Sequence, residues 1–139
     1  MAGGAFAAHG LDGWFRQKYA GQLFDKKIST PEGPKVVEQI PLDRKFLADF
    51  DTGARYQMYH ALALIGLGLA ATPANRRWTN AAGVCLLLGI IGFSGGLYVY
   101  TLANLRWVGM LIVPLGGTLS IVGWILFALA AARRQGVAA

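Results

Sequence analysis

The chain has 139 residues, a formal net charge of +6 and a hydrophobic fraction of 55%, so it is long enough for one domain and no more. A basic protein that binds nucleic acid gathers its Lys and Arg on one folded face, whereas every charge after residue 55 here is an arginine between or after apolar runs. This pattern is typical of membrane proteins and argues against a nucleic-acid partner. The single cysteine, Cys85, excludes an internal disulfide.

Residues 12–55 form the polar part of the chain. Apolar side chains recur at helical spacing at Leu11, Trp14, Phe15, Tyr19, Leu23 and Phe24. This spacing predicts an amphipathic helix at the membrane interface, whose basic side chains lie near headgroups. Those basic residues are Arg16, Lys18, Lys26 and Lys27. The stretch "STPEGP" at residues 29–34 ends this predicted helix.

A second helix is predicted after this break. Leu42, Phe46 and Phe50 recur on one face, and Asp51 is placed to pair with Arg55 one turn later. If this helix continues into the first membrane span, Arg55 and Tyr56 lie at the membrane interface.

Three later segments are long and apolar enough to cross a bilayer, whose hydrocarbon core of about 30 Å requires roughly 20 helical residues. They are residues 56–72, 78–102 and 108–132, and the first is the shortest. None has the polar stripe of a surface helix. The predicted fold class is therefore all-α, a polytopic membrane helical bundle in which residues 1–139 form a single membrane domain.

The segments between the spans are short and predict tight turns. "TPANRR" at residues 72–77 and "ANLRW" at residues 103–107 supply turn-forming and charged residues. One side of the membrane then holds Arg76, Arg77, Arg133 and Arg134, and the other holds Arg106. Since short cytoplasmic loops carry an excess of Lys and Arg, the C-terminus is predicted to be cytoplasmic.

The candidate binding residues open the first span, in "RYQMYHAL". Polar groups in lipid usually face a bundle interior, a neighbouring backbone or the headgroup layer. Arg55, Tyr56, Gln57 and His60 therefore form either a site for a headgroup, quinone or proton, or a simple interfacial anchor. The only other histidine is His9. Two histidines on different helices are able to ligate a haem, but nothing in the sequence brings these two together, so no cofactor and no metal site is predicted.

Small residues are dense in the last two spans. Gly92 and Gly96 form a G-xxx-G step, which allows the backbones of two helices to approach closely. Gly116, Gly117 and Gly123 repeat this density in the last span. We favour packing within this chain over an oligomer or transport interface. Pro114, at the start of the last span, is expected to kink it.

The spans offer little chemistry. All seven acidic residues precede residue 52, and no nucleophile has a base near it in the sequence. A proton-coupled transporter would normally need an intramembrane carboxylate. The chain is therefore predicted not to be an enzyme.

Four ordered blocks resemble a known family. They are "GAFAAHGL" at 4–11, "FDTGARYQMYHALAL" at 50–64, "GIIGFSGGLYVYTL" at 89–102 and "VPLGGTLSIVGWILFALAA" at 113–131. Together they resemble domain of unknown function 423, a family of small bacterial inner-membrane proteins also related to transmembrane protein 256. The resemblance implies four membrane helices, a multi-pass inner-membrane location and no established activity.

Two departures from that family bear on the organisation of the chain. In the family the first block closes a complete membrane helix, so residues 1–11 are interpreted as the remnant of this helix. Either the true start lies upstream of Met1, which we favour, or this protein has lost most of that helix. The segment around residues 26–45 is longer than the family pattern, either as a partner-binding elaboration or as a solvated insertion, and we favour the insertion.

The leading hypothesis is a non-enzymatic accessory or structural protein whose partners are the lipid bilayer and other membrane protein subunits. The alternative is a binder or carrier of a lipid or quinone that uses the segment from Arg55 to His60.

Overall fold

A computed structural model describes residues 10–135 of the chain. Contacts divide the chain into two compact units, Met1–Asp51 and Thr52–Ala139, and each is described by itself. Helix α3 (Leu42–Ala70) contains residues of both units, so the second predicted helix does continue into the residues of the first predicted span. The single membrane domain predicted for residues 1–139 stays a prediction.

Within the described residues, the first α-helix of this unit is α2 (Asp12–Lys18), which is shorter than the predicted amphipathic helix. The expectation that this helix reaches Phe24 is wrong. Gly21 has a φ of 72°, a left-handed conformation that a right-handed helix does not contain. An aromatic cluster holds this unit together, because the fully buried ring of Phe15 stacks on Tyr19 at 6.0 Å and meets Phe46 edge-on at 6.5 Å.

A β-hairpin follows α2, so the all-α prediction is wrong for this segment. Strand β1 (Leu23–Thr30) pairs antiparallel with β2 (Gly33–Pro41), and the predicted insertion supplies most of both strands. Prolines within and around β2 prevent a helix there. The β-branched residues of both strands favour an extended chain. They are Ile28 and Thr30 in β1 and Val36, Val37 and Ile40 in β2. Gly33 closes the turn with a φ of 117°.

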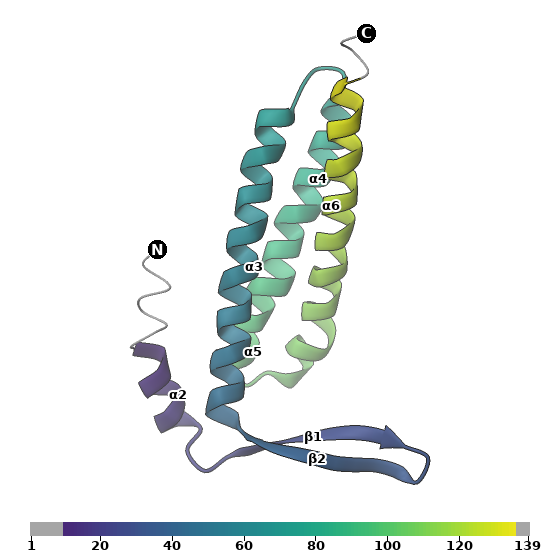
Figure 1. The fold of residues 1–139 in the computed structure, drawn as a ribbon. Coiled ribbons are helices and arrows are strands. Elements are labelled where there is room, and N and C mark those ends of the chain that lie inside the picture. The colour runs from purple at the N-terminus through teal and green to yellow at the C-terminus, as the bar shows by residue number, and fades with distance from the viewer. Residues whose placement is uncertain (1–9, 136–139) are drawn as a thin grey trace. The chain divides into compact units, whose positions relative to one another are not determined.

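The second unit contains three helical rods, shown in Figure 1 as α3, the α4 to α5 rod and α6. The middle rod consists of α4 (Arg76–Gly89), the π-helical turn η2 (Ile90–Gly95) and α5 (Gly96–Ala103). The last rod opens with the π-helical turn η3 (Val108–Ile112) and continues as α6 (Val113–Gln135). Both predicted turns are present between the rods.

Two of these rods, Arg76–Ala103 and Val108–Arg133, are long and apolar enough to cross a membrane. They correspond to the predicted spans 78–102 and 108–132. The first predicted span, residues 56–72, is not confirmed. Polar side chains from Arg55 to His60 lower the hydropathy of this part of α3, and its uninterrupted apolar run starts only at Ala61.

The core of the second unit gathers small and aliphatic side chains from all three rods. Ala63 and Leu67 of α3 meet Ala82 and Leu86 of α4 and Ala130 of α6. Larger residues pack around this centre, namely Leu64, Trp78, Leu126 and Phe127. All three rods thus contribute side chains to one apolar core.

Glycines bring the middle and last rods into backbone contact. A Cβ atom added to Gly92 would lie 2.9 Å from the Cα of Gly116, and one added to Gly116 would overlap the backbone of Gly92 and Phe93. Among the other predicted packing residues, Gly96 faces Val113, Gly123 faces Leu86 and Gly117 faces the ring of Phe93 at ordinary contact distance.

The last rod begins as a π-helical turn and becomes α-helical one residue before Pro114. Proline has no backbone N–H, so Pro114 cannot donate the hydrogen bond of a regular α-helix to residue 110. The π-helical turn η3 ends two residues before Pro114, and the predicted kink stays a prediction.

Candidate functional site

The predicted binding residues on α3 differ in their exposure. Arg55, Tyr56 and Gln57 are exposed, whereas His60 is buried. The amide oxygen of Gln57 accepts a hydrogen bond of 2.7 Å from the hydroxyl of Tyr98 in α5. His9 lies outside the described residues. The ligand-binding role of these five residues stays a prediction.

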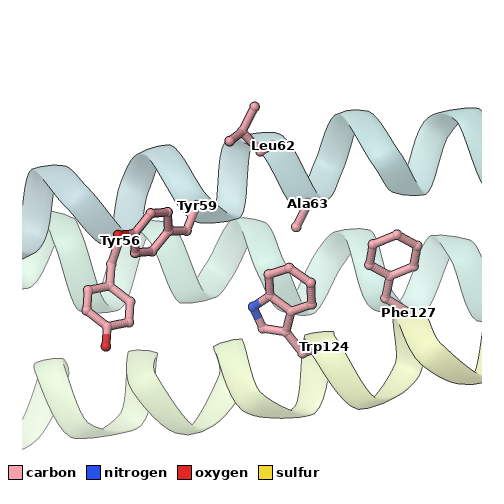
Figure 2. Close-up of a pocket in the computed structure, with 6 residues that line it drawn as sticks. All are labelled: Tyr56, Tyr59, Leu62, Ala63, Trp124 and Phe127. Atoms are coloured by element: carbon pink, nitrogen blue, oxygen red, sulfur yellow. The ribbon is translucent and has the colours of Figure 1, made fainter.

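The second unit has a groove between α3 and α6, shown in Figure 2. Its volume is about 560 Å³, and it is lined by Tyr56, Tyr59, Leu62, Ala63, Trp124 and Phe127. The two α6 rings stack with centroids 6.0 Å apart. Apart from the tyrosine hydroxyls and the indole N–H, the lining side chains are apolar, so this groove suits an apolar occupant.

His60 lies close to the groove without lining it. Its ring is 6.2 Å from that of Tyr56 and 6.4 Å from that of Trp124, and only 3% of the residue is exposed. The backbone of Tyr56 is a polar neighbour of the ring, but no hydrogen bond of good geometry satisfies Nδ1. An occupant of the groove would meet the two aromatic rings before it reached the imidazole.

Most of the residues that line the groove were not predicted from the sequence. Among the predicted site residues that the structure describes, Tyr56 alone lines it. Trp124 lies in the middle of a predicted span, and neither it nor Phe127 is among the residues predicted for the site. The spacing of Tyr56, Tyr59 and Ala63 along one helix face was the available signal, but the pairing of α3 with α6 is a tertiary feature.

A polar cluster lies near the end of α3, the start of α4 and the end of α6. The amide nitrogen of the fully buried Asn75 donates to the carbonyls of Ala70, at 3.1 Å, and Ala130, at 2.9 Å. Its amide oxygen accepts from the backbone N–H of Thr72 and from the hydroxyl of Thr79. One side chain therefore joins all three rods at this end.

Two arginines converge beside this asparagine. The guanidinium carbons of Arg133 and Arg77 lie 4.0 Å and 5.4 Å from the ring centre of Trp78. This contact places the start of α4 and the end of α6 at the same end of the unit, as the arginine pattern predicts. Arg106 lies between α5 and η3, at the other end of the middle rod.

Metal ligation has no support in the described part of the chain. Within residues 10–135, no group of three His, Cys, Asp or Glu side chains is placed to hold a metal ion. The fold and the site thus define a class, a small helical membrane protein with an apolar groove.

The chain belongs to the family described as a protein of unknown function, DUF423, whose model matches residues 3–117. A UPF0382 membrane protein of Staphylococcus epidermidis is 34% identical over 135 residues, covering 96% of this chain and 85% of the relative. The UPF0382 membrane protein YwdK of Bacillus subtilis is 32% identical, covering 94% and 84%. No solved structure matches.

The name of a third relative states the membrane in which it lies. The UPF0382 inner membrane protein YgdD of Escherichia coli is 39% identical over 88 residues, covering 62% of this chain and 66% of the relative. With membrane proteins as relatives and two helices able to span a bilayer, this chain is a membrane protein. The family resemblance seen in the sequence is confirmed.

Proposed function

We propose that this chain is a non-enzymatic, multi-pass protein of the bacterial inner membrane that acts as an accessory or structural subunit of a larger membrane assembly. The observation that carries the proposal is the groove between α3 and α6, which offers aromatic and aliphatic surface. An apolar helix of another membrane protein suits such a groove, because helix association in lipid depends on close packing.

The proposal includes α3 as a third membrane-crossing helix. Only the part of α3 after Arg55 is free of charged side chains, and its 15 residues are about 22 Å long. This is shorter than the hydrocarbon core of about 30 Å, so crossing requires local thinning of the bilayer. Large apolar side chains are exposed along it at Met58, Leu62, Ile65 and Leu69. Lipid or a partner helix would cover these side chains, whereas water would leave an extended apolar face uncovered.

The proposed orientation places the C-terminus in the cytoplasm. Arg76, Arg77 and Arg133 lie at one end of the two spans, and the short loop at the other end contains Arg106. When α3 also crosses the membrane, the N-terminal segment with its eight basic residues shares the side of Arg106. The orientation proposed here therefore depends on the arginines at the ends of the two spans, whose excess marks the cytoplasmic side. A reporter fused to the C-terminus, active only in the cytoplasm, tests this orientation, and activity of a periplasm-specific reporter at the same site would contradict it.

Site-specific photo-crosslinking in the native membrane tests the accessory role. A photoreactive residue at Leu62, in the groove, is expected to capture one discrete protein. The matched control is Ile91 of η2, which is similarly exposed, at 68% against 60%, but does not line the groove. Capture of lipid alone at both positions would contradict the accessory role.

A second candidate function is the binding of a lipophilic molecule in the same groove. It is favoured by the volume, which lies within the usual range of about 300–1,000 Å³ for ligand pockets. Lipid or quinone would then co-purify with the wild type and be lost in Trp124→Ala, and Arg55→Ala and His60→Ala would report on the polar end. Unchanged co-purification in all three variants would rule out this site.

A further inference from the structure

The end of the second unit that contains Asn75 and Trp78 has positive charge without an internal counter-charge. Residues 52–139 contain six arginines and no Asp or Glu. Within the described residues, Arg76, Arg77 and Arg133 take part in no ion pair. An arginine guanidinium keeps its charge at all relevant pH values. All three side chains are exposed, so their charge is accessible to an anion from outside the chain.

The geometry gathers this charge at one place. Arg77 comes from the start of α4 and Arg133 from the end of α6, yet both guanidinium groups lie within about 6 Å of the Trp78 ring, the range of a cation–π contact. Bringing two like charges to one ring costs electrostatic free energy. An anion that bridges the two guanidinium groups would offset this cost.

Unused hydrogen-bonding groups lie at the same end. The indole N–H of Trp78 and the hydroxyl of Thr72 are buried and have no hydrogen-bond partner. Helix α4 begins at Arg76 without a side-chain cap, so the N–H groups of its first turn add further positive potential. These groups are all donors suited to an oxyanion.

The depth of the cluster selects the anion. Arg76 and Arg133 are the first and last residues of the two spans, so the cluster lies at the level of the lipid headgroups in any bilayer that these spans cross. Phosphodiester groups are the anions concentrated there, and arginine binds their oxygens in a bidentate manner. We propose that Arg77, Arg133 and Trp78 form a binding site for the phosphodiester headgroup of an anionic glycerophospholipid.

Native mass spectrometry of the full chain tests the proposal, with protein released from bilayers that contain phosphatidylglycerol and phosphatidylcholine in equal amounts. The wild type is expected to retain phosphatidylglycerol preferentially. The double variant Arg77→Gln/Arg133→Gln is expected to lower that preference roughly tenfold or more, since it removes two charged hydrogen-bonding groups. Circular dichroism of each variant checks that the helices remain folded.

The matched control is Arg106→Gln, which removes an arginine from the opposite end of the spans and is expected to keep the preference. Arg77→Lys/Arg133→Lys keeps the charge but removes the bidentate geometry, and is expected to give an intermediate loss. An equal loss in Arg106→Gln, or no loss in the double glutamine variant, would overturn the proposal. Displacement of the lipid by added inorganic phosphate would assign the site to a free anion instead. The inference depends on the two spans alone, so its failure leaves the accessory role standing.

Discussion

The two units of this chain are stabilised in opposite ways. Residues before 52 contain all seven carboxylates and form an aromatic cluster and a hairpin with mostly exposed side chains. Residues from 52 onward contain no carboxylate, and their helices meet through glycine, alanine and one buried asparagine. The first unit is therefore stabilised by burial of apolar side chains and by charge pairs. The helices of the second unit are stabilised by close packing of small residues, which is the usual way for helices in lipid to associate.

The contact between Gly92 and Gly116 offers the largest test of this comparison. Gly116→Val is expected to destabilise the second unit by about 3 kcal/mol, because any side chain there overlaps the backbone of η2. Unfolding in mixed detergent micelles measures the change. The matched control is Gly68→Ala on α3, where nothing lies within 4 Å of an added Cβ. A loss of stability in the control equal to that in Gly116→Val would show that the glycine contact is not special.

Removal of the buried asparagine is expected to have the next largest effect. Asn75→Ala deletes hydrogen bonds to all three rods and removes the acceptor of the Thr72 backbone N–H, at a cost of about 2 kcal/mol. The same unfolding measurement applies, with the exposed Asn80 of α4 changed to alanine as the control. Equal stability of the two variants would mean that water or lipid replaces these bonds without loss.

A change in the hairpin turn separates the two units. Gly33→Val places a β-branched residue at a φ of 117°, which is expected to cost the hairpin about 1–3 kcal/mol. Hydrogen exchange is expected to speed up for amides of β1 and β2, while the amides of α4 and α6 keep their protection. Faster exchange in α4 or α6 would show that the units unfold together.

The smallest effect is expected from the hairpin ion pair. Lys26 and Glu38 lie 3.5 Å apart with more than half of each side chain exposed, and exposed pairs contribute about 0–1 kcal/mol. Lys26→Gln should therefore leave thermal unfolding of the hairpin nearly unchanged in physiological salt. A clear loss that high salt abolishes would mean that charge pairing matters more to this unit than its cross-strand contacts.

Long apolar runs made the last two helices predictable. The ends of the rods Arg76–Ala103 and Val108–Arg133 lie within two residues of the ends of the predicted spans. A long apolar segment in lipid must satisfy its own backbone hydrogen bonds, and a helix does this. The hairpin was not predictable in the same way, since Leu23 and Phe24 continue the helical spacing of α2. The left-handed conformation at Gly21 interrupts that spacing, and glycine alone does not reveal its φ.

The site was less predictable than the fold. The sequence marked His60 by its chemistry, yet burial removes it from the groove, whereas Trp124 enters the groove because α6 packs beside α3. The arginine pattern correctly placed Arg77 and Arg133 at one end, but their convergence on Trp78 depends on side-chain geometry. Both the lining of the groove and the convergence of the two arginines depend on contacts between segments that are far apart in the chain.

The contact between Gly92 and Gly116 also limits how this protein is able to evolve. In most packed interfaces, a larger residue on one side is tolerated once a neighbour becomes smaller. Here both partners are glycine, and no amino acid is smaller, so growth at either position has no compensating change at the other. Drift in sequence is therefore expected to pass around this crossing point, while the surfaces that face lipid are free to vary.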